Sequence, residues 1–437
     1  MKRLLSSSAF ALALTTVSAS LAQAEDLTLC WAAWDPANAL VELSKDYEAQ
    51  SGNKMNFEFI PWPNFADRIQ NELNSGGKLC DLLIGDSQWI GGGAENGHYV
   101  KLNDFFDANA ISMDDFMPAT VYAYSTWPKG TPNYYALPAM ADANGWFYRK
   151  DWFTDPAIMA DFKTKTGRDL AEPKSQKELL EIAQFFQGRE IDGKKVYGAS
   201  IFTERGSEGI TMGITGALYA WGVKYENTPG KYDMEGAINS PAAIEALEFY
   251  KAFYDTATPP GYTNAYMGES LDAFKSGQVA MAMNWFAFFP GLAADPALKD
   301  KIDFFVNPAQ VTAGSTLGGQ GISVVSYSDK QDAALDYIKW FAQPDVQAKW
   351  SKLGGYSAAN SVVNDPAFAT SSPFAGDFLE AMQNVQDFWQ EPAYAELLLA
   401  MQARMHDYVV AGKGTAKEAL DGLVADWTVV FQDEGKL

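Results

Sequence analysis

The 437-residue sequence contains few of the residues on which catalytic and metal sites usually depend. It has two histidines, far apart in the chain, and two cysteines. The patterns G-x-S-x-G, H-E-x-x-H and C-x-x-C do not occur, and Gly77-Lys78 continues into Leu79 instead of completing a phosphate-binding loop. Hydrolytic and zinc chemistry therefore lack their usual parts, and we expect no catalytic residue, no cofactor and no metal.

Basic residues are scarce relative to acidic ones. The chain has 33 Lys and Arg against 55 Asp and Glu, which gives a formal net charge of −22 at pH 7. A surface with such an excess of negative charge repels nucleic acids and anionic membranes. We therefore expect neither of them as a partner.

Long apolar runs are also missing after the first residues of the chain. The most apolar later stretch, Val279 to Ala294, is interrupted by Asn284 and Pro290. A helix that spans a bilayer needs about 20 consecutive apolar residues, so this stretch is too short and too polar. We therefore expect a soluble mature protein.

The beginning of the chain has a different pattern. Lys2 and Arg3 precede a stretch of mostly small and apolar residues that ends in Ala22-Gln23-Ala24. A positive start, an apolar centre and an A-x-A site are typical of a secretory signal peptide. The pattern predicts that residues 1–24 are removed on export and that the mature chain begins at Glu25.

The two cysteines, Cys30 and Cys80, each lie in an apolar segment with strand-like composition. Neighbouring strands are about 5 Å apart, which is close enough for a disulfide. An oxidising compartment outside the cytoplasm permits that bond. The sequence leaves open whether the two residues form a disulfide or remain two buried thiols.

The residues that are abundant follow an alternating order of strands and helices. Strands are predicted at residues 27–31, 55–60 and 82–84, with helices at 38–51 and 62–73 between them. This βαβαβ order predicts a parallel sheet with right-handed crossovers. Because a single domain rarely exceeds about 250–300 residues, the chain length predicts two lobes.

The same patterns continue through the rest of the chain. Further strands are predicted at residues 145–149, 196–202, 279–284, 302–306 and 322–326, and helices at 178–186, 241–254, 271–275 and 331–341. Residues 344–437 are predicted to be mostly helical. In open α/β sheets ligands bind beyond the carboxyl ends of the strands, so the polar cluster that begins at Asp86 is a candidate ligand contact.

Several motifs occur in a fixed order along the chain. They are LCWAAW at 29–34, CDLLI at 80–84, YALP at 135–138 ahead of FYRKD at 147–151, FKSGQVAM at 274–281, LGGQGI at 317–322 and the segment 334–350. Through these motifs the whole mature chain resembles the extracellular solute-binding proteins of ATP-binding cassette importers. The resemblance is to the class that binds carbohydrates and includes maltose-binding protein.

The resemblance implies an α/β fold of two lobes, each a mainly parallel sheet flanked by helices, with a hinge between them. It places the first lobe at residues 25–138 and 286–341, and the second lobe at 139–285 and 342–437. A carbohydrate would be held in the cleft by hinge closure and delivered to the permease subunits of an importer in the inner membrane. The protein is accordingly expected to be a periplasmic monomer.

A neutral sugar offers hydroxyl groups and C–H faces, so its site needs planar polar side chains and aromatic platforms. The family positions carried onto the first half of this chain are Trp34, Asp35, Asp86, Gln88, Asp142 and Asn144. For each acid the alternative is a structural role in a loop or at a helix start. Asp35, which precedes Pro36, is the clearest case in which a helix cap competes with a ligand contact.

The family positions from residue 204 onward are Glu204, Arg205, Asn284, Trp285, Gly319, Gln320, Tyr356 and Trp389. Trp285 is the main stacking candidate, with core packing as the alternative. Arg205 would hold sugar oxygens or an anionic substituent, unless it forms a surface ion pair. Many relatives carry Trp where this chain has Gln320, and this departure leaves the identity of the sugar open.

Two other classes of function remain as alternatives at this point. An exported glycoside hydrolase needs only two carboxylates about 5–10 Å apart, and Asp86 and Asp142 are candidates for that pair. A chain with 55 acidic residues contains such pairs by chance, which weakens this hypothesis. A peptide- or metal-binding protein is a third class, but the sequence has no cluster of histidines or carboxylates at metal-ligand spacing.

Overall fold

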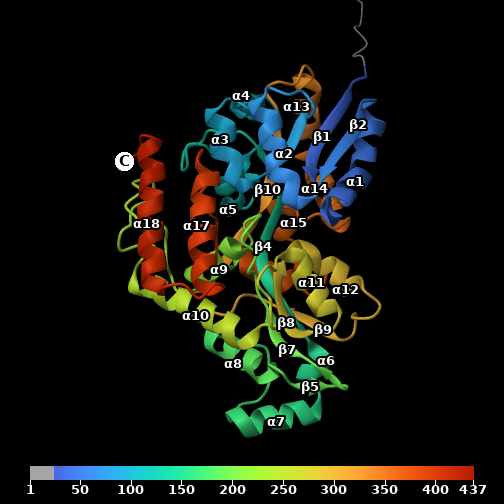
Figure 1. The fold of residues 1–437 in the computed structure, drawn as a ribbon. Helices are drawn as coiled ribbons and strands as arrows, with labels where there is room; N and C mark the ends of the chain where they lie inside the picture. The colour runs from blue at the N-terminus through green and yellow to red at the C-terminus, as the bar shows by residue number, and fades with distance from the viewer. Residues whose placement is uncertain (1–23) are drawn as a thin grey trace, which may run out of the picture.

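The computed structural model describes residues 24–437, so the predicted signal peptide lies outside the described residues except for Ala24. Two lobes lie one above the other in Figure 1, and the strands β4 (Leu137–Arg149) and β10 (Ser315–Val324) run between them. Within residues 24–437, no helix combines the length and the apolar character that a membrane span requires.

The first lobe begins with the predicted βαβαβ unit. The strands β1 (Asp26–Ala32), β2 (Lys54–Ile60) and β3 (Leu82–Asp86) alternate with the helices α1 (Asp35–Ser51) and α2 (Trp62–Asn74). β1 pairs in parallel with both β2 and β3, as predicted. Helix α1 forms because its apolar residues recur at helical spacing, and the prediction that Leu40, Leu43 and Tyr47 face inward is confirmed by their burial.

A disulfide joins Cys30 in β1 to Cys80, just before β3. The Cα atoms of the two residues are 5.6 Å apart, a separation that suits this bond. The question that the sequence leaves open is thereby answered in favour of the disulfide. It ties two neighbouring strands of the first lobe together.

One sheet continues from the first lobe into the second, in the strand order β2-β1-β3-β10-β4-β8-β7. Strand β10 is antiparallel to both β3 and β4, and β4 is antiparallel to β8 (Val279–Trp285) and β9 (Ile302–Phe305). Strand β7 (Tyr197–Ser200) is parallel to β8. The predicted two-lobed α/β fold is confirmed, but the prediction of a mainly parallel sheet in each lobe holds only for the first lobe. The sheet is continuous and mixed, because β4 and β10 cross between the lobes in opposite directions and β4 pairs antiparallel with β8 and β9.

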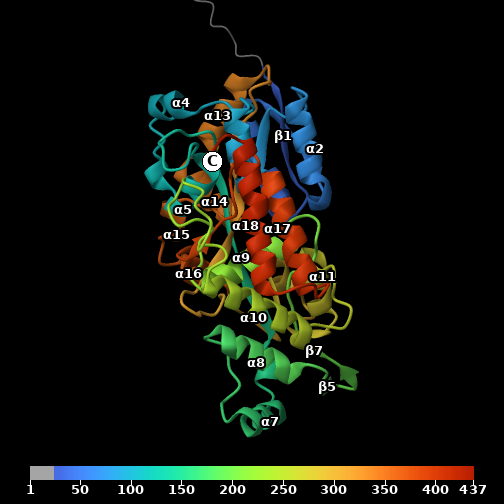
Figure 2. The same cartoon turned by 60° about the vertical axis from the view of Figure 1, so that its left-hand side comes forward.

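Helices cover this sheet, and the short strand β11 (Val385–Gln386) pairs in parallel with β10. The remaining helices and strands follow in chain order. They are α3 (Ile90–Glu95), α4 (Asn103–Ala108), α5 (Pro118–Thr120), α6 (Lys150–Phe153), α7 (Pro156–Thr166), α8 (Gln176–Phe186), β5 (Glu190–Ile191), β6 (Lys194–Lys195), α9 (Gly209–Ala220), α10 (Pro241–Ala257), α11 (Met267–Lys275), α12 (Phe289–Ala294), α13 (Gln331–Phe341), α14 (Pro344–Lys352), α15 (Asn360–Val363), α16 (Ala375–Met382), α17 (Tyr394–Val409) and α18 (Ala416–Asp433). Figure 2 shows α17 and α18 side by side, packed against α10.

The buried apolar side chains form two cores. Residues 346–382, with Trp350 and Phe378 fully buried, pack in the first core, whereas α17 and α18 pack in the second through residues such as Trp427. The sequence-based division gave the second lobe all residues from 342 onward. Because residues 346–382 share a core with β1 and β3, we propose that the first lobe extends to about residue 384.

Candidate ligand-binding site

A small cavity, here called the inner cavity, lies between the lobes beyond the ends of β1, β3 and β8. Its volume is about 30 Å³, which is enough to hold a water molecule or another small polar group. The lining residues come from both lobes. They are Trp34, Trp62, Asp86, Ser87, Gln88, Asp142, Glu208, Met212, Tyr266, Met267, Trp285, Leu317, Gly318, Gly319 and Gln320.

A larger hollow, here called the outer cleft, lies next to the inner cavity, and Leu317 lines both. Its volume is about 850 Å³. Its lining is rich in aromatic and charged side chains, among them Tyr122, Trp127, Tyr219, Tyr225, Tyr232, Phe388, Trp389, Glu95, Lys129, Lys224, Glu226, Asp387, Glu391 and Lys436. The inner cavity and the outer cleft together form the candidate site.

The first lobe presents its polar groups where its strands end. Strand β3 ends at Asp86, whose carboxylate accepts a hydrogen bond of 3.0 Å from the Gln88 backbone N–H and so starts a short 3-10 turn at residues 87–89. Trp34 follows β1, and its ring packs against that of Trp62, the first residue of α2. Gln320, on β10, accepts a hydrogen bond from the indole of Trp31.

A chain of hydrogen bonds crosses from one lobe to the other. Gln88 Nε2 donates to one carboxylate oxygen of Glu208 at 3.0 Å, and the Tyr266 hydroxyl donates to the other at 3.0 Å. Trp285 Nε1 in turn donates to the Tyr266 hydroxyl at 3.2 Å. Glu208 immediately precedes α9 and has a φ of 75°, a left-handed conformation that is costly for a residue other than glycine.

Three carboxyl groups of the inner cavity have pKa values above the ordinary range. Burial raises the pKa of Asp86 to about 7, and the nearby Asp387 carboxylate adds to this effect. Burial followed by the charge of Asp86 raises the pKa of Glu208 well above its usual value. Burial also raises the pKa of Asp142 well above its usual value, although the backbone N–H groups of Ala143 and Ala287 donate to its carboxylate.

Two buried polar atoms at the inner cavity lack a hydrogen-bond partner among residues 24–437. They are the indole nitrogen of Trp34, a donor, and Gln88 Oε1, an acceptor. Buried polar groups are normally paired, because an unpaired group loses its hydrogen bonds to water without replacement. A ligand that accepts from the indole and donates to the amide would satisfy both atoms.

Eight of the predicted site residues lie in the candidate site. Seven line the inner cavity, namely Trp34, Asp86, Gln88, Asp142, Trp285, Gly319 and Gln320, and Trp389 lines the outer cleft. Gly319 has a φ of 89° and lies against the Met140 carbonyl, so a side chain here would be strained and would also clash. The inner cavity therefore brings together residues as far apart in the sequence as Trp34 and Gln320.

Three predicted residues lie at the surface or in a loop outside the cavity. Asp35 is exposed in the first turn of α1, where a negative charge favours the helix N-terminus. Arg205 is exposed, and Glu204 accepts a hydrogen bond of 3.4 Å from the Gly209 backbone N–H. The physical reason is that the loop turns its buried acid, Glu208, toward the cleft instead.

Three other predicted residues are structural. Asn144 Oδ1 accepts hydrogen bonds from Asn307 Nδ2 at 2.8 Å and from the Thr316 backbone N–H at 3.0 Å, which joins β4 to β10. Asn284 Nδ2 donates to the Met267 carbonyl at 3.0 Å. Tyr356 is buried in the first core and donates to the Phe286 carbonyl. The side-chain atoms of Asn144, Asn284 and Tyr356 named here thus bond to other parts of the protein and not to a ligand.

Several residues of the site escape the sequence reasoning. Trp62 follows β2 as Trp34 follows β1, so the rule that ligands lie beyond strand ends would have found it. Glu208 and Tyr266 each precede a helix, and no local pattern shows that they face each other. Asp387 follows a strand of two residues, β11, which is too short to recognise from its composition.

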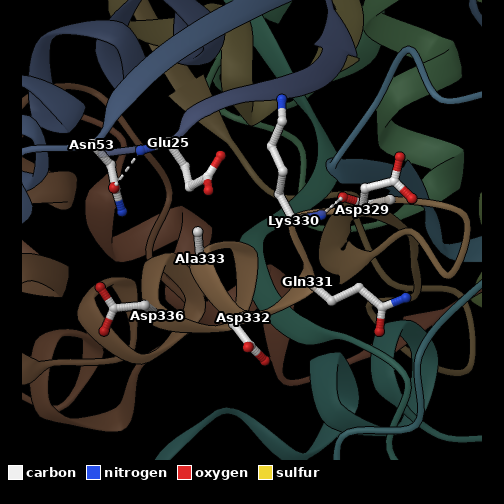
Figure 3. A pocket seen from close by; sticks show the side chains of 9 residues that line it. Glu25, Asn53, Asp329, Lys330, Gln331, Asp332, Ala333 and Asp336 are labelled. Atoms are coloured by element: carbon white, nitrogen blue, oxygen red, sulfur yellow. Dashed lines mark hydrogen bonds between the residues drawn. The ribbon is translucent and has the colours of Figure 1, made fainter. Parts of the chain in front are cut away.

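A separate surface hollow of about 560 Å³ lies at the opposite edge of the first lobe (Figure 3). Glu25 and Asn53, which precede β1 and β2, lie on one side of it, and the start of α13 lies on the other. Asp332 and Asp336 line it, but no aromatic residue does among the described part of the chain. It lacks a stacking platform and lies at the wrong ends of the strands, so we do not assign the ligand to it.

The sequence of this chain is similar to those of known bacterial proteins. Residues 42–375 match the family model described as bacterial extracellular solute-binding protein. A probable ABC transporter-binding protein of Deinococcus radiodurans is 23% identical over 381 residues, which cover 85% of this chain and 86% of that protein.

Two solved structures share the fold. A solute-binding protein from Agrobacterium radiobacter K84 in complex with ribitol has a TM-score of 0.76 and 22% identity, over 93% of this chain and 98% of that one. The maltose-bound MalE3 of T. maritima has a TM-score of 0.78 and 21% identity, over 93% of this chain and 100% of that one. At this level of identity the likeness establishes the architecture of two lobes, one sheet and a cleft between them.

Proposed function

Because the chain belongs to the bacterial extracellular solute-binding proteins, we propose that it captures a small polyhydroxylated ligand and delivers it to an ATP-binding cassette importer. The complexes of related fold with ribitol and with maltose support a ligand of this class, which includes sugar alcohols, mono- and disaccharides and glycosides. The proposed partners are the permease subunits of the importer, and the proposed location is the periplasm. We propose that the protein acts as a monomer.

One observation carries the proposal. Aromatic and polar side chains from both lobes line the same cavity, with Trp34, Asp86 and Gln88 on the first lobe and Glu208 and Trp285 on the second. Sugar hydroxyls both donate and accept hydrogen bonds, and sugar C–H faces pack on indole rings. The inner cavity offers both kinds of contact.

The proposed mechanism is hinge closure. A ligand that touches both lobes stabilises the arrangement in which they face each other, as the hydrogen bond between Gln88 and Glu208 does in this structure. β4 and β10 are the sheet strands that connect the lobes, so we propose that the hinge lies along them and in the segment that precedes α17. Closure then creates the surface that the permease recognises.

The proposed function includes no turnover of the ligand. The family and the structures of related fold are binding proteins of transport systems. Asp86 and Asp142 do line the same cavity, as the glycoside hydrolase hypothesis requires. One oxygen of Asp142, however, is occupied by backbone N–H groups of Ala143 and Ala287, which suits a structural acceptor better than a general acid.

A screen with two readouts tests the proposal. The mature protein is mixed with sugar alcohols, monosaccharides, disaccharides and glycosides, and its thermal unfolding is followed. A ligand present at 100 times its Kd stabilises the protein by about 2.7 kcal/mol, which gives a clear rise in Tm. Chromatography of the mixture should recover the sugar unchanged. A panel without a single binder would overturn the proposed function, and conversion of the sugar would favour the hydrolase.

A further inference from the structure

The inner cavity contains acidic side chains without basic ones. Asp86, Asp142 and Glu208 line it, and none of the lining residues in the described chain is Lys, Arg or His. Asp387, in the adjoining outer cleft, is close enough to raise the pKa of Asp86 and Glu208 through its charge. The protein therefore provides the cavity with carboxyl groups, which are anionic once they lose a proton, and with no positive charge of its own.

Two basic side chains of the adjoining outer cleft, Lys129 and Lys436, have partners of their own. Lys129 Nζ donates to the carbonyl oxygens of Tyr122 and Ala123 at 2.9 and 3.0 Å, within the outer cleft. Lys436 is paired with Glu391. Arg205, the residue that would recognise an anionic substituent, is exposed outside the cavity. A negatively charged ligand would therefore find no cation in the inner cavity and would oppose the ionisation of its carboxyl groups.

An unpaired amide oxygen gives an independent indication of the ligand group. Gln88 is only 3% exposed, and its Nε2 donates to Glu208, which fixes its Oε1 as a free acceptor beside the cavity. This oxygen requires a donor. An ammonium group carries only donors, and the aromatic rings of Trp285 and Tyr266 at the same cavity attract cations to their faces.

We propose, on the basis of the proposed function, that the ligand is a polyhydroxylated compound with an ammonium group, which binds in the inner cavity among Asp86, Gln88 and Glu208. A cavity of about 30 Å³ suits a group of this size. The hydroxylated remainder of the ligand extends past Leu317 into the outer cleft, whose volume is about 850 Å³. There it meets rings such as Trp127 and Tyr225.

Proton release is a consequence that can be measured. Burial keeps the pKa of Asp86 near 7, so part of this group is protonated at neutral pH. A cation within about 4–6 Å favours the charged carboxylate and lowers its pKa. Binding of the ammonium ligand should therefore release protons, whereas binding of the matched neutral compound should release fewer.

The test uses compounds that differ in a single group. The two matched sets are glucamine, glucitol and gluconate, and glucosamine, glucose and glucuronate. Titration calorimetry at pH 7.5 in two buffers of different ionisation enthalpy gives the affinity and the number of protons released. We expect the amine of each set to bind at least tenfold more tightly than its neutral partner, with the acid binding most weakly. Proton release is compared between glucamine and glucitol, because the amine of glucamine is already fully protonated at this pH, and glucamine should release more protons.

The outcomes separate this inference from the proposed function. Equal or tighter binding of the neutral member overturns the ammonium proposal and leaves carbohydrate capture intact. If neither the amines nor the neutral compounds bind, and the wider sugar panel gives no binder, both proposals fail together. If gluconate or glucuronate binds most tightly, the inference that the inner cavity prefers a cationic group is wrong.

Variants of Asp86 and Glu208 test whether these two carboxyl groups cause the preference for the amine. Glu208→Gln and Asp86→Asn should each lower the affinity for the bound amine at least tenfold more than the affinity for its neutral partner, and should reduce proton release. Glu204→Gln is the matched control, because Glu204 lies in the same loop outside the cavity. Circular dichroism checks the fold, and Asp86→Asn carries the test if Glu208→Gln does not fold. An equal loss for amine and neutral compounds would contradict the proposal.

Discussion

The inner cavity and the outer cleft lie between the same two lobes, yet they differ in size and in charge balance. The inner cavity measures about 30 Å³ and is lined by three acids without a base. The outer cleft measures about 850 Å³, and its acids have partners, as Glu391 does in Lys436 and Glu95 in the indole of Trp127. The difference suggests that the inner cavity selects the charge of the ligand and the outer cleft selects its shape.

The largest expected effect is on the free energy of unfolding, because the aromatic side chains of the two regions differ in burial. Trp285 at the inner cavity is 6% exposed, whereas Tyr122 at the outer cleft is 50% exposed. Trp285→Ala removes a buried indole and should lower the free energy of unfolding by about 3–5 kcal/mol. Tyr122→Ala should change it by less than about 0.5 kcal/mol. Urea unfolding measures both, and similar losses in the two variants would contradict the difference in packing.

The second prediction uses pH to isolate the inner cavity. The pKa of Asp86 is about 7 in the folded protein and about 3.9 in an unfolded chain. The folded state therefore holds the proton more tightly, and stability should fall as pH rises from 4 to 7, by up to about 1.4 kcal/mol per unit for this group. Asp86→Asn should make the slope less steep in urea unfolding across this range; an unchanged slope would count against the assignment.

The outer cleft should respond in the opposite direction and in another pH range. Burial lowers the pKa of Lys129 to about 7, so above that pH the folded state holds this proton less tightly than the unfolded chain does. Stability should then rise as pH increases from 7 toward 10. Lys129→Met should reduce this rise. If the variant keeps the wild-type pH profile between 7.5 and 9.5, another group is responsible.

The next prediction concerns the approach of the lobes at the edge of the outer cleft. A Cβ atom added to Gly91, in α3, would lie 2.2 Å from the carbonyl oxygen of Gln390 in the second lobe, whereas one added to Gly92 would lie 3.7 Å from its nearest neighbour. Gly91→Ala should therefore hinder closure and weaken binding of the identified ligand about tenfold. Gly92→Ala is the matched control, with little change expected.

Two measurements decide the outcome for Gly91→Ala. Calorimetry gives the affinity, and X-ray scattering with ligand present shows whether the variant stays more extended than the wild type. Unfolding should change by less than about 1 kcal/mol, because alanine favours a helix more than glycine does. Equal affinity in the two glycine variants would show that the segment around Gln390 moves aside.

The smallest effect is expected at the rim of the outer cleft. Lys436 Nζ lies 5.4 Å from the ring centre of Trp127, a first-lobe residue, and pairs with Glu391. Lys436→Gln should weaken binding two- to fivefold, since a cation–π contact of this kind contributes about 0.5–1 kcal/mol. Lys417→Gln, which breaks an exposed pair with Asp421 on the same helix, should leave the affinity unchanged. Equal losses of affinity in Lys436→Gln and Lys417→Gln would contradict a role of Lys436 in closure.

The fold was largely predictable because its elements carry local signals. Helix α13 spans Gln331–Phe341 as predicted, and α1 and α8 bury the residues that their periodicity places inward. Strands β4 and β10 begin earlier than predicted, at Leu137 and Ser315. Their first halves contain small or polar residues without alternation, and it is pairing with each other that makes these segments strands.

The site was predictable only in part, because contacts depend on where a residue lies after folding. Asp142 and Asn144 lie two positions apart in β4, but Asp142 lines the cavity whereas Asn144 bonds to Asn307. In the loop before α9, Ser207 and Glu208 both have a positive φ, and in this conformation Glu208 lines the cavity whereas Arg205 is exposed. That choice depends on the backbone conformation, which no local residue pattern indicates.

The disulfide between Cys30 and Cys80 has a consequence for how the protein must be made. It fastens β1 to the segment before β3, and these are the strands that carry Trp34 and Asp86 at their far ends. A chain synthesised in a reducing cytosol would fold without this disulfide, and the segments that carry Trp34 and Asp86 would be less rigid. Material for binding studies should therefore come from an oxidising secretory route, since reduced preparations would under-report the affinity.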